Sequence, residues 1–267
     1  MTATIVTITS GKGGVGKTTT TANVAFALAD LGERVVCIDG DIGLRNLDVV
    51  MGLENRIVYD LVDIVEGRCR LRQAMIKDKH FENLFLIPAA QTRDKSAVSP
   101  SDMVRLCEQL KPDYDWVLID SPAGIERGFR NAIAPADRVL VVTNPEVSSV
   151  RDADRIIGLV EAEEKGPADL VINRLNPNMV KRGDMLTADD VVELLAINII
   201  GIVPEDENVV ISTNRGTPIV LSDKSKAGLA FKNIAGRLQG NTVPFLDLDE
   251  KGGFFHRISG LLRSGGD

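Results

Sequence analysis

The stretch from Ser10 to Thr19, with the sequence SGKGGVGKTT, constrains the fold of this chain more than any other segment. It follows an apolar, β-branched run at residues 5–8 and precedes a helical pattern at residues 23–29. A glycine-rich turn between a strand and a helix points several backbone N–H groups at one anion, and the helix dipole adds to their effect. The spacing from Gly11 to Thr18 therefore predicts a phosphate-binding loop for a nucleoside triphosphate.

The side chains of this loop have separate predicted roles. Lys17 is placed to reach the β- and γ-phosphates, and the Thr18 hydroxyl is placed to bind Mg²⁺. A second lysine, Lys12, adds a cation that an ordinary phosphate loop does not require. The residues that we predict to bind the nucleotide here are Gly11, Lys12, Gly13, Gly14, Val15, Gly16, Lys17, Thr18 and Thr19.

Apolar strand-like runs alternate with helical patterns along most of the 267 residues. The runs are nearly continuous in Val, Ile and Leu, as is typical of parallel strands that are covered on both faces. We expect strands at 34–39, 84–88, 116–120, 138–143, 169–173 and 199–203, and helices at about 101–111, 148–164, 187–196 and 223–238. This pattern predicts an α/β fold with a doubly wound, mostly parallel sheet and helices on both faces. Ligands of such folds bind at the carboxyl ends of the strands.

Two of these strands end in carboxylates, on the side where the phosphates are expected. Asp39 closes the strand at 34–39 and is predicted to hold Mg²⁺ directly or through water, while Asp41 is predicted to orient the attacking water. Asp120 closes the apolar strand at 116–120 in the manner of a Walker B motif, which places it in the outer shell of the metal. Residues 121–124 follow as a turn able to sense the γ-phosphate.

A base site is expected further along the same edge of the sheet. Asn173 closes one strand, and Pro204 and Glu205 follow another. The amide of Asn173 offers the paired donor and acceptor that an adenine edge needs. The alternative is that Asn173 caps a helix and Pro204 belongs to an ordinary turn.

The sequence KGGVGKTT at residues 12–19 resembles the deviant Walker A motif of the ParA/MinD family. Further stretches resemble the cell-division branch of that family, and they lie at 41–48, 88–95, 120–126, 143–152, 182–186 and 201–206. The resemblance implies an ATPase that uses ATP and Mg²⁺ and forms an ATP-dependent homodimer. It further implies that Lys12 reaches the nucleotide of the partner copy, that Asp41 acts on the water, and that the base contacts come from the two places named above.

The same resemblance implies partners and a location. It implies recruitment of a MinC-type division inhibitor and, in some bacteria, release by a MinE-type activator. The protein is expected in the cytoplasm, peripheral on the inner face of the cell membrane, with no specific nucleic acid. Partner contacts are implied for the helix around residues 148–155, where a solvated first turn capped by a serine is the alternative.

The C-terminal segment has the pattern of an interfacial membrane anchor. If residues 253–263 form a helix with about 100° per residue, five apolar side chains fall within an arc of about 120°. They are Phe254, Phe255, Ile258, Leu261 and Leu262. A free helix this short is marginal in water, so one copy should bind weakly and two copies on a dimer much more tightly. We therefore expect an ATPase domain at 1–240, a linker at 241–250 and a membrane-targeting tail at 251–267, the alternative being a helix packed on the domain.

Other functions of this fold remain as alternatives. A ParA-like DNA-partition ATPase shares the loop, but the net charge of −7 disfavours nonspecific binding to DNA. A flagellar-number regulator would also use a membrane helix. An iron-protein reductase needs clustered cysteines, whereas Cys37, Cys69 and Cys107 are scattered, and a small-molecule ligase would need an acceptor pocket that the sequence does not indicate.

The role of Lys17 leads to a first prediction. Lys17→Ala should abolish nucleotide binding, because the triphosphate loses the cation that is fixed in the loop. Titration calorimetry with ATP measures this directly, and an affinity equal to that of the wild type would contradict the assignment.

Overall fold

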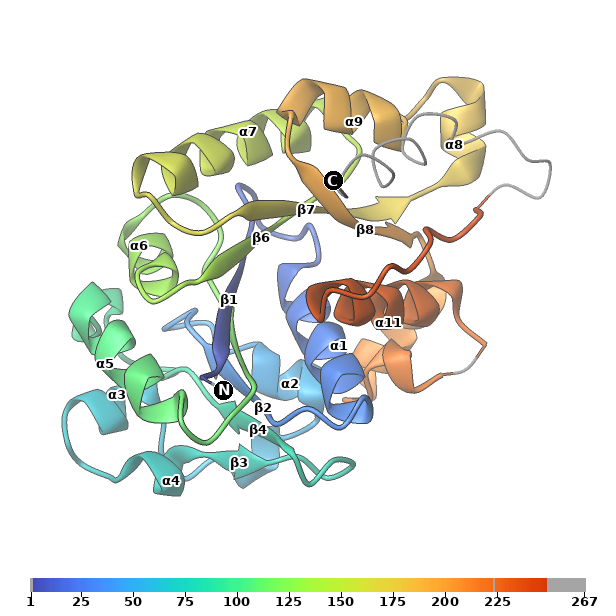
Figure 1. The fold of residues 1–267 in the computed structure, drawn as a ribbon. Helices are drawn as coiled ribbons and strands as arrows, with labels where there is room; N and C mark the ends of the chain where they lie inside the picture. The colour runs from blue at the N-terminus through green and yellow to red at the C-terminus, as the bar shows by residue number, and fades with distance from the viewer. Residues whose placement is uncertain (1, 223, 249–267) are drawn as a thin grey trace.

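The computed structural model of the chain describes residues 2–222 and 224–248, and within them an eight-stranded sheet forms the centre of the molecule (Figure 1). Its strands are β1 (Thr4–Thr9), β2 (Val35–Asp39), β3 (Ile76–Lys77), β4 (Leu84–Ile87), β5 (Trp116–Asp120), β6 (Arg138–Thr143), β7 (Ala168–Leu175) and β8 (Asn198–Pro204). The strand order is β3-β4-β2-β5-β1-β6-β7-β8. Neighbouring strands are parallel except for β3 and β4, which are antiparallel.

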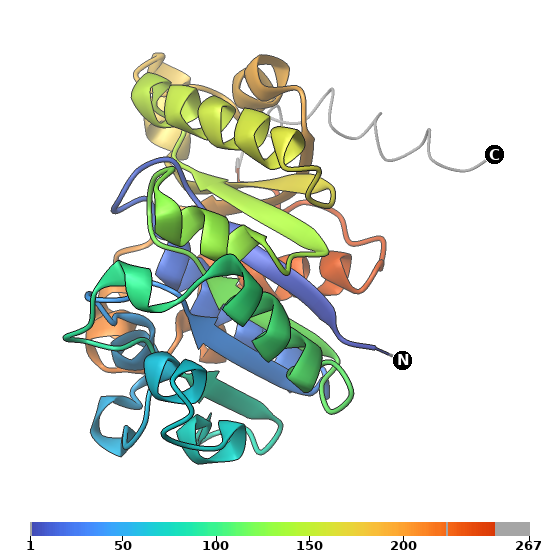
Figure 2. The same cartoon turned by 90° about the vertical axis from the view of Figure 1, so that its left-hand side faces the viewer.

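Helices connect these strands and cover both faces of the sheet. The longer ones are α1 (Lys17–Asp30), α5 (Pro100–Leu110), α6 (Arg127–Ile133), α7 (Val147–Ala162), α9 (Ala188–Leu195), α10 (Glu207–Asn214) and α11 (Lys226–Leu238). The shorter ones are α2 (Leu47–Met51), η1 (Glu54–Arg56), α3 (Leu61–Val65), α4 (Leu71–Ala74), η2 (Lys95–Ala97), α8 (Pro177–Arg182) and η3 (Ile219–Leu221). Helices α1 and α11 lie on one face, and α5, α6, α7 and α9 lie on the other (Figures 1 and 2).

The strands read as continuous apolar runs because both of their faces are buried. In β2, the side chains of Val35 and Cys37 join the core beneath α1 and α11, and those of Val36 and Ile38 join the core on the opposite face. All four are fully buried. Alternate residues of one strand thus serve two cores, as the two-residue period of a strand requires.

The strand order places a ligand crevice at the carboxyl end of β1. After β1 the chain crosses to β2 on one side, and β6, β7 and β8 extend the sheet on the other side. Doubly wound sheets bind ligands where the direction of winding reverses. The predicted phosphate loop lies at this point, between β1 and α1.

The predicted fold class is confirmed, with differences in detail. The strands at 116–120 and 138–143 have the expected bounds, but the two-residue strand β3 and several short helices carry too little periodicity to be recognised. Helix α11 begins at Lys226 and not at residue 223, because the Ser225 hydroxyl accepts the N–H of Gly228 at 3.0 Å and caps the helix there.

The segment at 241–250, expected as a linker, packs against the domain over its described part. Leu248 is buried, and Phe245 and Leu246 pack against the core. The predicted tail at 251–267, with its five apolar residues, lies outside the described residues. Among residues 2–222 and 224–248, no helix has the length and apolar character that a membrane span would need.

Candidate nucleotide-binding site

The loop between β1 and α1 ends at the N-terminus of a buried helix. Gly16, at the N-cap, has a φ of 96°, in the left-handed region that favours glycine. Among the described residues, no side chain caps α1 and no acid lies in its first turn. The first N–H groups of α1 are therefore open to an anion, and the helix dipole favours one there.

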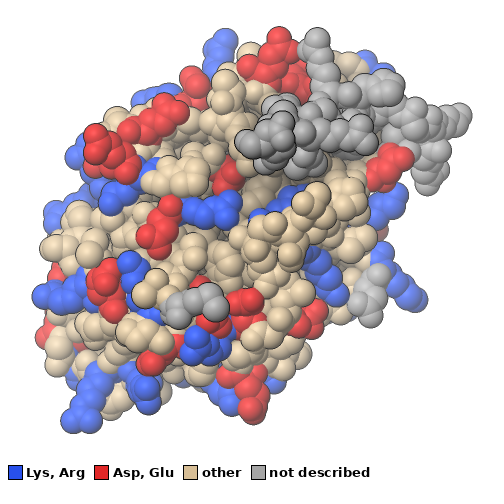
Figure 3. All heavy atoms as spheres, in the orientation of Figure 1, with Lys and Arg blue, Asp and Glu red and all other residues tan. Residues whose placement is uncertain are grey.

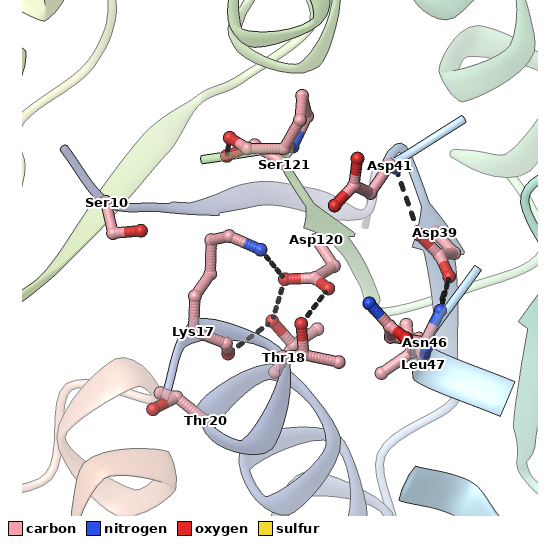
Figure 4. A network of polar contacts seen from close by, with 12 residues as sticks. Ser10, Lys17, Thr18, Thr20, Asp39, Asp41, Asn46, Leu47, Asp120 and Ser121 are labelled. Atoms are coloured by element: carbon pink, nitrogen blue, oxygen red, sulfur yellow. Dashed lines mark hydrogen bonds and ion pairs between the residues drawn. The ribbon is translucent and has the colours of Figure 1, made fainter. Parts of the chain in front are cut away.

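Asp120, at the end of β5, is the centre of the polar network in this site (Figure 4). Its Oδ1 accepts from Lys17 Nζ at 3.0 Å and from Thr21 Oγ1 at 3.1 Å, and its Oδ2 accepts from Thr18 Oγ1 at 2.7 Å. Asp120 and Lys17 are both buried, so their attraction is little screened by water. One carboxylate therefore fixes the side chains predicted to bind phosphate and metal.

Asp39 lies beside Asp120, because β2 and β5 pair in a register that places the two residues opposite each other. The Asp39 carboxylate accepts the N–H groups of Asp41 at 3.0 Å, Asn46 at 3.2 Å and Leu47 at 3.1 Å. Burial, together with the negative charge of Asp120, raises the pKa of Asp39 to about 7. The repulsion from the neighbouring Asp120 thus adds to burial in disfavouring the charged form of Asp39.

This arrangement fits a magnesium ion. Carboxylate and hydroxyl oxygens are the ligands that Mg²⁺ prefers, and Thr18, Asp39 and Asp120 bring such groups to one strand edge. A divalent cation would offset the repulsion between the two carboxylates. These three residues would hold the ion, which in turn neutralises charge on the phosphates.

Asp41 lies at the start of the loop that leaves β2. Its side chain is half-buried, and its carboxylate points toward the space beside Ser121 and Asp120 (Figure 4). The backbone holds this loop in place, since Gly40 N–H donates to the Asp120 carbonyl at 2.9 Å and Gly43 N–H donates to the Ala90 carbonyl at 2.8 Å. The position agrees with the predicted role on the water, which stays a prediction.

Lys12 is exposed, and in this single chain it contacts helix α7. Its Nζ donates to Ser148 Oγ at 3.5 Å. Beside it, a Cβ on Gly11 would overlap with the backbone carbonyl of Asp152, so only glycine fits between the loop and α7. The phosphate loop and the helix with implied partner contacts are thus packed directly together.

The predicted base residues lie at the same edge as the loop. Asn173 Nδ2 donates to the Val15 carbonyl at 2.8 Å, so one of its amide hydrogens is bound to the loop. Pro204 is buried at the end of β8, and the exposed Glu205 accepts from Asn176 Nδ2 at 2.7 Å. The fold therefore brings these residues together, while their contact with adenine stays a prediction.

Sequence reasoning missed Thr21, which donates to Asp120 at 3.1 Å. A signal for it was available, because Thr21 follows Lys17 by four residues and shares its face of α1. The backbone donors of Asn46 and Leu47 to Asp39 gave no such signal, since any residue could supply them.

The sequence and the fold of this chain are similar to those of known proteins. Residues 6–219 match the family described as "CobQ/CobB/MinD/ParA nucleotide binding domain". Septum site-determining protein MinD from Synechocystis sp. is 55% identical over 244 residues, which cover 91% of this chain and 92% of that protein. The MinC:MinD cell division protein complex from Aquifex aeolicus matches with a TM-score of 0.85 and 50% identity, covering 92% of this chain and 99% of that chain. MinD complexed with Mg-ADP from Pyrococcus horikoshii matches with a TM-score of 0.80 and 29% identity, covering 88% and 96%.

This chain belongs to the CobQ/CobB/MinD/ParA nucleotide-binding family. Membership confirms the predicted family, its P-loop fold and the ATPase class, and the Mg-ADP of the Pyrococcus relative agrees with the predicted cofactors. The roles of the individual residues stay predictions, and the contacts of each side chain in the site define what it is predicted to do.

A matched pair of glycines tests the geometry of the loop. Gly16→Ala should lower the free energy of unfolding by about 1–3 kcal/mol, because the new side chain meets a left-handed φ and overlaps with Asn173 Nδ2. Gly13→Ala, whose Cβ would point into open space, should change it by less than about 0.5 kcal/mol. Urea denaturation of the nucleotide-free chain measures both, and equal losses would contradict the geometry.

Proposed function

We propose that this chain is a peripheral membrane ATPase that helps to position the cell-division site. With ATP it forms a homodimer, binds the cytoplasmic face of the cell membrane and recruits a MinC-type division inhibitor, and hydrolysis releases it. A MinE-type activator, where present, would accelerate that release. The observation that carries this proposal is the MinC:MinD complex from Aquifex aeolicus, which shares 50% identity and nearly the whole fold with this chain.

The geometry of the site supports the nucleotide half of the proposal. Lys17 and the open N-terminus of α1 supply positive charge where the phosphates would lie. Thr18, Asp39 and Asp120 supply the oxygens for Mg²⁺, and Asp41 stands at the edge of the same site as the residue for the water. The chemistry asked of these residues is positioning and charge stabilisation, which is what phosphoryl transfer to water needs.

Dimerisation rests on the exposed Lys12. In a single chain, and among the described residues, Lys12 Nζ donates only to Ser148 Oγ at 3.5 Å, a long and exposed hydrogen bond that costs little to break. Lys12 is therefore available to reach the nucleotide of a second copy, as its place in the motif implies. Partner binding is proposed for the neighbouring start of α7, where Val147 is exposed.

Membrane binding is proposed for the tail at 251–267, through Phe254, Phe255, Ile258, Leu261 and Leu262. One such helix is too short to hold a monomer firmly, and two on a dimer gain from effective concentration. The domain at 1–240 would then carry the ATPase site, with the segment at 241–250 between the two.

Two other functions fit the sequence less well. DNA partition would need a basic surface, and on the face drawn in Figure 3 basic and acidic residues are interspersed without a continuous basic stripe. The ParA family ATPase from Chlorobium tepidum is 24% identical to this chain, a likeness that indicates only the fold. A flagellar-number regulator would use a membrane helix in the same way. It would differ from the proposed function in the partner protein that it binds.

Vesicle co-sedimentation tests the proposal. The full chain should pellet with vesicles of phosphatidylglycerol and phosphatidylethanolamine in ATP but not in ADP or without nucleotide, because only the dimer presents two anchors. A chain that ends at Asp249 should stay in the supernatant throughout. If neither chain pellets while ATP induces a shift of DNA, the partition function is correct and the tail only packs on the domain.

Asp41 provides a second test, of hydrolysis. Asp41→Ala should leave ATP-driven dimers intact and slow hydrolysis, by about 10²-fold or more, since the residue serves the water and not the phosphates. Dimers are measured by light scattering and hydrolysis by phosphate release. Asp113→Ala, in the turn that precedes β5 and far from the carboxyl end of the strand, is the matched control, and normal hydrolysis by the Asp41 variant would refute the role.

A further inference from the structure

Residues 243–248, which we name the C-terminal strap, are held to the domain by the side chain of Arg237. Arg237 Nε donates to the Val243 carbonyl at 2.9 Å, Nη2 donates to the Pro244 carbonyl at 2.9 Å, and Nη1 donates to the Ile200 carbonyl of β8 at 2.8 Å. The guanidinium carbon also lies 4.0 Å from the centre of the Phe245 ring. One side chain thus joins the strap, α11 and β8.

The strap crosses the edge of the sheet, where β8 is the outermost strand. Leu246 packs against the core beneath α11 and also against the core on the opposite face, and Leu248 is buried in the latter. Figure 1 shows the strap leaving α11 and passing β8. It covers an edge that would otherwise offer unpaired backbone groups.

These contacts of Arg237, which we name the clamp, depend on the shape and charge of a guanidinium group. The strap forms no ladder with β8, so its carbonyls need other donors, and a planar guanidinium can serve three carbonyls and a ring at once. Burial lowers the pKa of Arg237 to about 10, which still leaves the group charged at neutral pH. Lysine or glutamine could not make the same set of contacts.

We propose that Arg237 is a positioning residue for the membrane anchor. It docks the strap on the edge of the sheet, so only a short length of chain separates the domain from the anchor. This inference rests on the proposed function of the tail, and it adds a residue and a mechanism to it. Arg237 contacts β8 at Ile200, far along the strand from Pro204 and the nucleotide edge, so the clamp acts on membrane binding and not on catalysis.

The length of chain decides how strongly two anchors cooperate. With the strap docked, six residue steps separate Leu248 from Phe254, a reach of at most about 20 Å. With the strap released, the free chain starts at Leu238, and sixteen steps give up to about 55 Å. Effective concentration falls roughly as the −3/2 power of tether length, so release should weaken the ATP-dependent binding of a dimer about fourfold.

Limited proteolysis tests the clamp itself. Arg237→Gln should speed the cleavage of the full chain by chymotrypsin at Phe245 by about tenfold, because a docked segment must open before it is cut. Arg72→Gln, an identical change at an exposed guanidinium remote from the strap, should leave the rate unchanged. Unchanged cleavage in the Arg237 variant would overturn the clamp. Normal ATP hydrolysis shows that the variant is folded.

Vesicle binding tests the consequence, with full-length variants and phosphatidylglycerol–phosphatidylethanolamine vesicles. Inserting six Gly/Ser residues between Leu248 and Asp249 leaves the clamp intact and should weaken binding in ATP about threefold. Arg237→Gln combined with Phe245→Ser should weaken it about fourfold; the serine is needed because a released Phe245 could itself enter the lipid. In ADP, where a single anchor is too weak to bring the chain down, neither the wild type nor the variants should pellet.

The outcomes separate this inference from the proposed function. Weaker binding in ATP by both variants, with normal hydrolysis, supports the clamp as the element that sets tether length. Wild-type affinity in both variants would overturn it, although the tail would remain a membrane anchor. If the wild-type chain does not bind vesicles in ATP, the proposed function is refuted, and the membrane role of the clamp with it. The proteolysis result would still decide whether Arg237 holds the strap.

Discussion

The buried pairing of Asp120 with Lys17 is the interaction on which the site depends. Asp120 ends β5 and Lys17 begins α1, so a single contact of 3.0 Å joins the two elements that meet at the ligand crevice. Thr18 and Thr21 complete the coordination of the carboxylate. A buried charge pair is stable only when its remaining hydrogen-bonding capacity is satisfied, and the threonines do this. The helix is thereby held with its N-terminus facing the phosphate position.

Much of the fold was predictable because its signals are local. The phosphate loop, the acidic strand ends and the continuous apolar runs each lie within a few residues of sequence, and the bounds of β5 and β6 agree with expectation. The contacts of Lys12 with Ser148 and of Asn173 with Val15 were not predictable, because they join residues 136 and 158 positions apart. Such contacts depend on how the helices pack on the assembled sheet, and the periodicity of the sequence does not predict that packing.

The electrostatics of the site were only partly predictable for a related reason. Both Asp39 and Asp120 were recognised as strand-end acids, but their mutual effect depends on the register of β2 with β5. That register puts them opposite each other and, with burial, raises the pKa of Asp39. The two carboxylates therefore favour a bound cation even before any phosphate enters the site, and Lys17 already occupies that role at Asp120.

The packing of the phosphate loop on α7 has a thermodynamic consequence. Gly11 leaves no space between the loop and Asp152, and Lys12 touches Ser148, so a change in the shape of the loop must displace the start of α7 or be resisted by it. Two ligands that bind on the two sides of one such contact change each other's affinity by the same factor. A protein that binds α7 more tightly when ATP is present must, by the same factor, tighten the hold of the loop on ATP. A partner of this kind would be an allosteric effector of ATP affinity as well as a protein that ATP recruits.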